Sequence, residues 1–330
     1  VDLTGNYNSQ RGYKPTVYKE LKKLSEITEL KEINNIFYSV EDEIHIKENV
    51  YIPKNINIVF GENKIIYFHN NAILFSEANL NFIGTKKNLV KIKGYNKKNG
   101  SLIHIGGSFN SQNLVVENLL FPNLASYKLY SGINLINSKN TIKNTSIINS
   151  SSEDAINIID SESYIDELLI KNTLSDALDV DGGRLSFGKI FCENIINDCL
   201  DISGVQFSGN LLVVNNAGDK GFSAGENSRG QIKIVKVSNS EIGVAVKDSS
   251  IIDINELKLE KVKLDIAVYN KKLEFGESKL KIGKSEKAYN YLVGEDNELE
   301  VSGYKITDKL KNKTIINKLY GNQYGSKTIR

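Results

Sequence analysis

The sequence contains few residues that break or cross-link a chain. Its 330 residues include two cysteines, no methionine and three prolines, which are Pro15, Pro53 and Pro122. No proline follows residue 122, so strands in the later part of the chain can pair without interruption. The two cysteines permit at most one disulfide. We predict none, because Cys199 occupies a small-residue position of a repeat and Cys192 is expected on a different strand.

Long apolar runs and targeting signals are also missing. No apolar run reaches the roughly 18 residues of a membrane-spanning helix, which excludes such a helix. No signal peptide is visible, so the localisation cannot be read from a targeting signal. The chain begins at Val1 and lacks methionine, which predicts a mature form or a piece of a longer protein.

Charge is distributed unevenly along the chain. Residues 153–203 hold twelve acidic and three basic residues, a balance of −9, although the whole chain carries +2. This acidic block excludes nucleic acid as a partner there, because phosphate contacts require Lys and Arg. Residues 304–330 hold seven Lys or Arg and one Asp. This basic tail fits either a solvated segment or contact with an anionic surface.

A short sequence motif, called a phrase below, recurs at a fixed spacing between residues 154 and 248. The positions that recur at this constant 22-residue step are Asn157, Asp179, Asp201, Ser223 and Ala245. A fixed period of roughly 20 to 50 residues is typical of solenoids. Apolar residues alternate with polar ones in each phrase, which indicates a short strand with one buried face. A 22-residue unit fits three short strands and three turns, so the repeat predicts one coil of a parallel β-helix.

The same register predicts what lies inside each coil. Leu178, Leu200 and Phe222 are expected to stack in one column of the core. A second ladder recurs at nearly the same step and consists of Asn149, Asn172, Asn194 and Asn216. We expect inward amides there that satisfy the backbone groups of the turns.

The two ends of the chain have weaker, helical patterns. Apolar spacing predicts an N-terminal capping helix near residues 16–30, with a partner-binding helix as the alternative. A partly helical pattern over residues 306–320 suggests a cap at the far end. The expected fold is all-β, a single-stranded right-handed parallel β-helix. Its divisions are an N-terminal segment with the helix at 1–33, the β-helix at 34–303, and a cap with a basic tail at 304–330.

Alternation also predicts which side chains point outward. One outward column holds His104, Asn134, Asn157, Asp179, Asp201 and Ser223, and a second, two residues further along, holds Asp181, Ser203 and Lys247. Strands stack about 4.8 Å apart, so Asp179, Asp181 and Asp201 should lie within one small area. Neighbouring carboxylates repel, which favours a bound cation, a basic partner or catalysis. Asp176 and Asp198 at the strand starts fit structural turn residues equally well.

The coil after Asp201 differs from its neighbours. Lys220 replaces the Asp at the strand start, and Glu226 and Arg229 follow in the turn. Lys220 above Asp198, and Lys247 near Glu226, are either charge pairs that hold the stack or catalytic groups.

The repeat resembles the right-handed parallel β-helix of the pectate-lyase-like superfamily. The phrases that carry this resemblance start at Asp176-Ala-Leu-Asp179, Asp198-Cys-Leu-Asp201, Lys220-Gly-Phe-Ser223 and Ile242-Gly-Val-Ala245. Over roughly residues 40–280 the chain is similar to β-helix modules of bacterial surface proteins, some joined to spore-coat-H-type kinase domains. The resemblance implies an extracellular, cell-surface or periplasmic protein, with other domains of a longer surface protein as partners.

The resemblance also implies a polysaccharide partner, because the superfamily binds sugars on this outward face. Polygalacturonase-like hydrolases place three Asp on neighbouring coils, as Asp179, Asp181 and Asp201 would be, but their Gly-His-Gly and Arg-x-Lys motifs are missing here. Calcium-dependent lyases combine a carboxylate cluster for Ca²⁺ with a basic residue. By that analogy the three Asp would hold Ca²⁺, and Lys220 or Lys247 would be the base.

Two functions fit these patterns. The first is a lyase, hydrolase or epimerase acting on an extracellular or capsular polysaccharide, with catalytic residues among Asp179, Asp181, Asp201, Lys220 and Lys247. Its substrate-binding residues would be His104, Asn134, Asn157, Ser203, Ser223, Glu226 and Arg229. The second is a non-catalytic surface module that binds glycan or acts as a rigid spacer. The enzyme is favoured because three Asp lie inside strands, where turn chemistry does not explain them.

Overall fold

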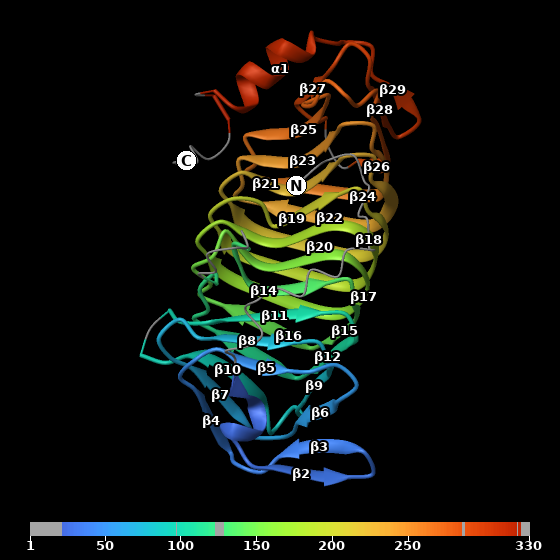
Figure 1. Cartoon of the computed structure of the whole chain (residues 1–330). Coiled ribbons are helices and arrows are strands. Elements are labelled where there is room, and N and C mark those ends of the chain that lie inside the picture. Colours follow the sequence, from blue (N-terminus) through green and yellow to red (C-terminus); the bar gives the residue numbers. More distant parts are fainter. Residues whose placement is uncertain (1–21, 97, 123–128, 286–287, 322, 325–330) are drawn as a thin grey trace.

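The computed structural model describes residues 22–96, 98–122, 129–285, 288–321 and 323–324. They form an elongated right-handed solenoid of stacked parallel strands (Figure 1). In this part of the chain, antiparallel pairing is confined to β2 with β3 and β28 with β29, one pair at each end. The expected all-β parallel solenoid is therefore confirmed.

Each coil contributes to three sheets, and several strands bend from one sheet into the next. The first sheet contains β1 (Lys22–Lys23), β5 (Val50–Ile52), β8 (Ile73–Ser76), β11 (Ser101–Ile105), β14 (Ser131–Ile136), the starts of β17 (Asp154–Thr173) and β18 (Asp176–Ile195), β19 (Leu200–Ser203), β21 (Lys220–Gly225), β23 (Ile242–Lys247), β25 (Leu264–Tyr269) and β27 (Tyr291–Val293). This sheet carries the acidic phrases.

The other two sheets complete the coils. The second contains β3 (Ile36–Ser39), β6 (Asn57–Phe60), β9 (Asn79–Ile83), β12 (Ser108–Gln112), β15 (Lys139–Lys143), the middle of β17 and β18, and the starts of β20 (Gln206–Ala217), β22 (Arg229–Ser238), β24 (Ile251–Glu260) and β26 (Lys279–Ser285), followed by β28 (Glu298–Val301). The third contains β4 (Glu43–Ile46), β7 (Ile65–Phe68), β10 (Val90–Gly94), β13 (Leu114–Glu117), β16 (Thr145–Ile148) and the ends of the longer strands.

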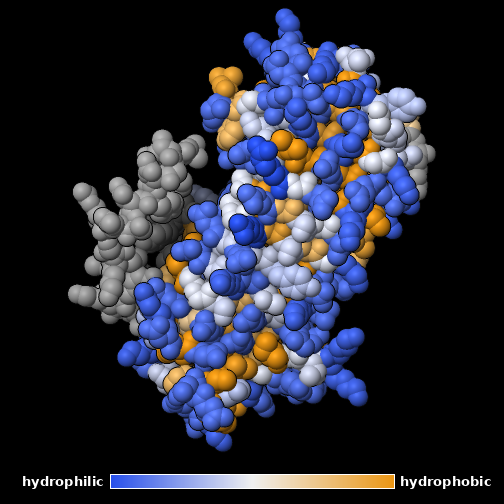
Figure 2. Space-filling view, turned by 90° about the vertical axis from the view of Figure 1, so that its right-hand side faces the viewer, coloured by the Kyte–Doolittle hydropathy of each residue, from blue (hydrophilic) through white to orange (hydrophobic). Residues whose placement is uncertain are grey.

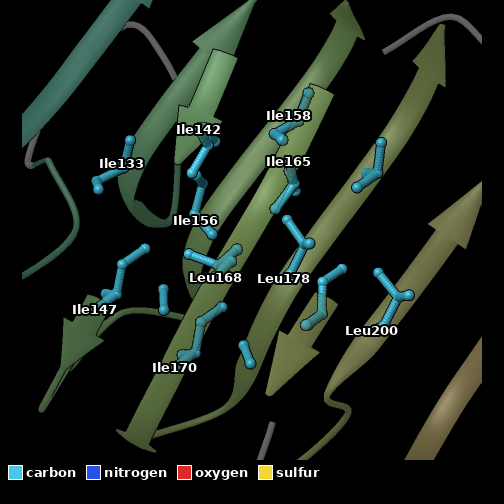
Figure 3. Packing of buried hydrophobic residues seen from close by; sticks show 14 of the residues in the cluster. Ile133, Ile142, Ile147, Ile156, Ile158, Ile165, Leu168, Ile170, Leu178 and Leu200 are labelled. Atoms are coloured by element: carbon cyan, nitrogen blue, oxygen red, sulfur yellow. The ribbon is translucent and has the colours of Figure 1, made fainter. Parts of the chain in front are cut away.

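Strand register reproduces the constant period of the sequence. Asn157 pairs with Asp179, Asp179 with Asp201, Asp201 with Ser223, and Ser223 with Ala245. Inside this ladder Ile156, Leu178, Leu200 and Phe222 are also paired, and each is at most 2% exposed. Figure 3 shows Ile133, Ile156, Leu178 and Leu200 contributed to the core by successive strands. The predicted core column is therefore confirmed.

The asparagine ladder exists, but it lies on the outside of the coils. Asn149, Asn172, Asn194 and Asn216 are exposed and have positive φ between 56° and 69°. Their side-chain amides hydrogen-bond to one another from coil to coil at 3.0–3.2 Å. The expectation of inward amides was wrong, because the left-handed backbone of these turns directs the side chains outward. Asn tolerates that conformation better than most residues.

Strands lie at the N-terminal end of the described part of the chain. Residues 16–21 of the predicted capping helix lie outside the described residues. Residues 22–30 form β1, a 3₁₀ turn at Leu24–Glu26 and the start of β2 (Leu30–Ile33), so the helix prediction was wrong there. Leu24, Ile27 and Leu30 nevertheless pack on the core. The spacing of these apolar residues correctly indicated that they are buried. It did not determine whether the backbone that carries them is a helix or a strand.

The predicted C-terminal helix is present as α1 (Asn312–Leu319), beyond the short strand β29 (Tyr304–Lys305). Its buried residues Ile315 and Leu319 pack against outward positions of β23, β25 and β27, among them Ala245, Ala267 and Leu292. The outward column of the first sheet thus changes from polar to apolar after Ser223. The helix covers the apolar part of this column, and the polar part lies next to the helix.

The two cysteines form a disulfide, so the prediction of no bridge was wrong. Cys192 at the end of β18 and Cys199 before β19 are close in the sequence, and their Cα atoms lie 5.9 Å from each other. The turn between the two strands folds back and brings them within the usual Cα distance for a disulfide. Placement on different strands therefore did not exclude the bond.

The surface of the solenoid is mixed in character. Hydrophilic and hydrophobic side chains are interspersed over the face shown in Figure 2. None of the helices in the described part of the chain combines the length and apolar character that a membrane span requires.

The core column leads to a first prediction. We expect Leu200→Asp to lower the free energy of unfolding by about 3 to 5 kcal/mol, because it buries an unpaired carboxylate among apolar side chains. Leu174→Asp is the matched control, because Leu174 is 59% exposed, and it should change stability by less than about 0.5 kcal/mol. Urea unfolding followed by circular dichroism measures both. Equal effects of the two substitutions would contradict the inward assignment.

Candidate functional site

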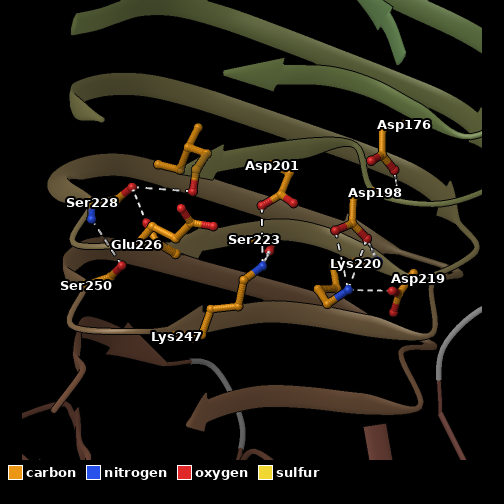
Figure 4. A network of polar contacts seen from close by, with 12 residues as sticks. Asp176, Asp198, Asp201, Asp219, Lys220, Ser223, Glu226, Ser228, Lys247 and Ser250 are labelled. Atoms are coloured by element: carbon orange, nitrogen blue, oxygen red, sulfur yellow. Dashed lines mark hydrogen bonds and ion pairs between the residues drawn. The ribbon is translucent and has the colours of Figure 1, made fainter. Parts of the chain in front are cut away.

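The candidate site is the polar outward face of β18, β19, β21 and β23 (Figure 4). Asp179 of β18 is directly beside Asp201 of β19, and Asp181 is beside Ser203 in the parallel column. Asp179, Asp181 and Asp201 are all half-buried. The structure therefore brings the three predicted aspartates together, but they are less exposed than solvated side chains on an open sheet.

A further column of acidic residues runs along the strand starts. Asp176 accepts hydrogen bonds at Oδ1 from the backbone N–H of Asp198 at 2.8 Å and from Nδ2 of Asn197 at 2.6 Å. Asp198 likewise accepts the backbone N–H of Lys220 at 2.9 Å. Each carboxylate therefore satisfies a backbone donor of the next coil. This agrees with the structural interpretation of Asp176 and Asp198.

Lys220 is the buried counter-charge of this column. Its side chain is 5% exposed, and its Nζ lies 3.4 Å from both carboxylate oxygens of Asp198. The same Nζ donates a hydrogen bond to Asp219. The predicted charge pair between Lys220 and Asp198 is confirmed, and this pair links the coil of Asp198 to the coil that follows it.

Lys247 pairs with Asp201, so its predicted pairing with Glu226 was wrong. The Nζ of Lys247 lies 3.6 Å from Oδ1 of Asp201 and donates to Oγ of Ser223 at 2.7 Å. Glu226 is paired with Lys272 instead. A Cβ on Gly225 would lie only 2.8 Å from Cε of Lys247. The missing side chain at Gly225 therefore lets Lys247 lie along the sheet toward Asp201.

Burial and mutual repulsion separate the pKa values of the aspartates. Burial raises the pKa of Asp179 well above its usual range, and the charges of Asp181 and Asp201 add to the effect. Burial also raises the pKa of Asp181 to about 6 and that of Asp154 to about 6. For Asp198 burial outweighs the attraction of Lys220 and raises the pKa to about 7.

Asp201 is shifted in the opposite direction. Burial alone would raise its pKa, but Lys247, Lys220 and a hydrogen bond from Ser223 outweigh burial and lower it. The neighbouring carboxylates raise the pKa values of both lysines despite burial, Asp198 and Asp219 acting on Lys220 and Asp201 on Lys247. The pKa values of Asp179 and Asp201 are therefore displaced in opposite directions, and Asp201 lies beside the ammonium group of Lys247.

His104 does not belong to this face, so its prediction as a substrate-binding residue was wrong. In the structure Ile103 pairs with Asn134, while His104 pairs with Leu135 and is fully buried. Burial lowers the pKa of His104 to about 4. The predicted outward column places His104 in line with Asn134, which is one residue out of register with the observed pairing. A shift of one residue exchanges the two faces of a strand.

The remaining predicted binding residues divide into two groups. Nδ2 of Asn157 donates to Oδ2 of Asp154 at 3.4 Å and to Oδ2 of Asp179 at 3.3 Å, which places Asn157 in the site. Asn134 is buried and donates to the backbone carbonyl of Ser131 at 2.9 Å. Arg229, by contrast, begins β22 of the second sheet, is exposed, and bonds to Asn227. The structure therefore does not bring Arg229 to this face.

Tyr320 is the neighbour of the site that the sequence did not reveal. Its ring lies 5.9 Å from Nζ of Lys220 and 4.8 Å from Nζ of Lys271, and its hydroxyl is 2.7 Å from that of Tyr269. It follows α1, so only the packing of the helix brings it to the edge of the cluster. No local sequence pattern signals this contact.

The described side chains include no group of three or more His, Cys, Asp or Glu that could hold a metal ion. Binding of Ca²⁺ by Asp179, Asp181 and Asp201 therefore stays a prediction, and the described side chains offer no such group of ligands to support it.

Comparison with known proteins adds no relative. No protein-family model matches the chain, and no significant match was found among curated proteins or solved structures.

The shifted pKa values lead to a second prediction. Unfolded Asp titrates near pH 3.9, whereas Asp154, Asp181 and Asp198 titrate near 6 to 7 in the folded state. The folded state holds these protons more tightly. The stability they contribute is therefore full below about pH 4 and is lost as the pH rises through about 6 to 7. We expect the melting temperature to fall between pH 5 and pH 8.

Asp181→Asn should flatten this decline and stabilise the protein at pH 8 by about 1 to 2 kcal/mol, because it removes one repelling carboxylate. Asp166→Asn, at an exposed position, should leave the wild-type profile unchanged. Differential scanning calorimetry across the pH range measures all three proteins. A wild-type profile that is flat from pH 5 to pH 8 would contradict the shifts.

Proposed function

We propose that this chain is a carbohydrate-active enzyme that hydrolyses glycosidic bonds of an extracellular or capsular polysaccharide. The observation that supports this most directly is the pair Asp179 and Asp201. Their carboxyl groups are neighbours in the ladder, and their pKa values are displaced in opposite directions. Two carboxyl groups with separated pKa values are the arrangement that acid–base catalysis requires at a glycosidic bond.

The proposed roles follow from the directions of the two pKa shifts. Asp179 would donate its proton to the leaving glycosidic oxygen. The Asp201 carboxylate would attack the anomeric carbon and form a covalent glycosyl ester. Asp179, now ionised, would then take a proton from water as the water oxygen displaces Asp201. Adjacent parallel strands are about 4.8 Å apart, which is close to the roughly 5 to 5.5 Å separation of retaining enzymes.

The lysines favour hydrolysis over elimination. A lyase needs a base that is unprotonated at working pH, whereas the pKa values of Lys220 and Lys247 are raised by their carboxylate partners. As ammonium groups they would instead keep Asp201 ionised and, with Ser223, hold it in place. Asn157, Asp181 and Ser203 would contact the sugar beside the reacting pair.

The fold and the disulfide support the proposed setting. A right-handed parallel solenoid fits membership of the pectate-lyase-like superfamily, whose outward face at this strand binds sugars. Disulfides persist mainly in oxidising compartments, which agrees with an extracellular, cell-surface or periplasmic location. The module could be joined to other domains of a surface protein.

A non-catalytic surface module is the second candidate, and the buried ion pairs favour it. Lys220 with Asp198 connects successive coils, Lys247 with Asp201 connects coils two apart, and the two lysine side chains are only 5% and 8% exposed. The stack itself could therefore account for these charges. The module would then bind glycan, or act as a spacer, without chemistry at Asp179.

Asp179→Asn tests the enzyme directly. A neutral Asn is close in shape to the protonated Asp179, so this change should preserve the melting temperature while removing the proton donor. On a responsive polysaccharide, we expect new reducing ends from the wild type and a loss of about 10²- to 10⁴-fold in kcat for the variant. Asp166→Asn is the exposed control and should keep full activity.

Asp201→Asn provides the complementary measurement. It should also abolish activity, but it leaves Lys247 without its carboxylate and should lower the melting temperature. Ultraviolet absorbance from unsaturated uronates would indicate a lyase instead. A protein that binds a polysaccharide of the panel without cleaving it would be the surface module.

A further inference from the structure

Two of the three histidines lie together on a different sheet from the aspartates. His45 belongs to β4 and pairs in register with Tyr67 of β7, and His69 follows directly after β7. Both are half-buried. The third histidine, His104, is fully buried in the core. The pair therefore contains the accessible imidazoles of this chain.

The two imidazoles converge on each other. Nδ1 of His45 lies 2.9 Å from Nε2 of His69. On the far side of the His45 ring, Nε2 lies 3.6 Å from a carboxylate oxygen of Glu43. One nitrogen of His45 thus faces the second imidazole, and its other nitrogen faces a carboxylate.

Aromatic rings and backbone bonds hold this arrangement in place. Tyr67 stacks on His45 with ring centroids 5.1 Å apart, and Tyr95 stacks on His69 at 4.1 Å. The backbone N–H of His69 donates to the carbonyl of Ile46 at 2.8 Å, which ties its position to the coil that carries His45. His45 is therefore carried by a paired strand, and His69 by the residue directly after one, where its backbone is bonded to the neighbouring coil.

We propose that His45 and His69 form a binding site for a divalent transition metal that prefers imidazole, such as Cu²⁺, Ni²⁺ or Zn²⁺. Nδ1 of His45 and Nε2 of His69 would be the protein ligands, and water or a small ligand would fill the other positions. Metal–imidazole bonds are about 2.0 to 2.1 Å long, so two such nitrogens at a tetrahedral metal lie roughly 3.3 Å apart. The observed 2.9 Å between the two nitrogens requires only a small rotation of the rings.

Glu43 supplies the partner that a ligating histidine usually has. The second nitrogen of a metal-bound imidazole commonly donates its N–H to a carboxylate, which fixes the tautomer and orients the ring. If the Glu43 carboxylate moved in from its present 3.6 Å to accept the N–H of His45 Nε2, the lone pair on Nδ1 would be directed toward His69.

The competing explanation is a plain hydrogen bond between two neutral imidazoles, and a titration with Cu²⁺ separates the two. The protein should carry no histidine tag. Isothermal titration calorimetry should give one tight equivalent, and the electron paramagnetic resonance spectrum should show coupling to two nitrogens. His45→Gln and His69→Gln should each weaken binding by at least about tenfold, and Glu43→Gln should weaken it by about tenfold.

Two controls exclude other ligands and loss of fold. Asp181→Asn should leave Cu²⁺ binding unchanged, because the acidic face lies on another sheet. Circular dichroism and the melting temperature without metal should be the same for both histidine variants and the wild type. Absent nitrogen coupling in the wild type, or undiminished binding in both histidine variants, would overturn the proposal. The nitrogen coupling of the wild type decides the matter even if a variant fails to fold.

Discussion

Parallel pairing in register at a constant coil length is the constraint on which the rest of this structure depends. Each residue of a coil lies directly beside its equivalent in the next coil, as Asp179 lies beside Asp201 and Leu178 beside Leu200. A column is therefore uniform in polarity unless its sequence changes. Apolar columns form the core, whereas acidic columns place like charges side by side, and the fold must offset that repulsion locally.

The chain offsets the repulsion between neighbouring aspartates in two ways. The pKa values of some aspartates are raised, and buried lysines pair with others. Asp179, Asp181 and Asp198 have raised pKa values, while Lys220 and Lys247 enter the columns one or two coils later and hold Asp201 in its charged form. The lysines come at the point where the outward column turns apolar and α1 covers the sheet. The polar face thus ends at the lysine–aspartate ion pairs. These pairs help to shift the pKa values of neighbouring carboxyl groups in opposite directions.

Prediction from sequence succeeded where the period was strict and failed where it loosened. The core column and the cluster of three aspartates follow from the constant register of residues 154–248. His104 was misplaced because its coil carries an insertion, and one residue of slip moves a side chain from the surface to the core. The Cys192–Cys199 disulfide and the Lys247–Asp201 pair depend on how a turn folds back and where a glycine leaves room. Spacing alone does not encode either.

By itself the sequence determined the solenoid, its coil length and, where the period is strict, the side of each strand that faces the core. A two-residue alternation repeated at a constant coil length allows only one way to pack the apolar side chains together. Only the tertiary structure decided which charges pair, how deeply they are buried, and that Tyr320 and α1 border the acidic face. It also decided that His45 and His69 meet. These contacts join segments through folded turns and side-chain conformations, whose geometry depends on neighbouring coils and on residues far along the chain.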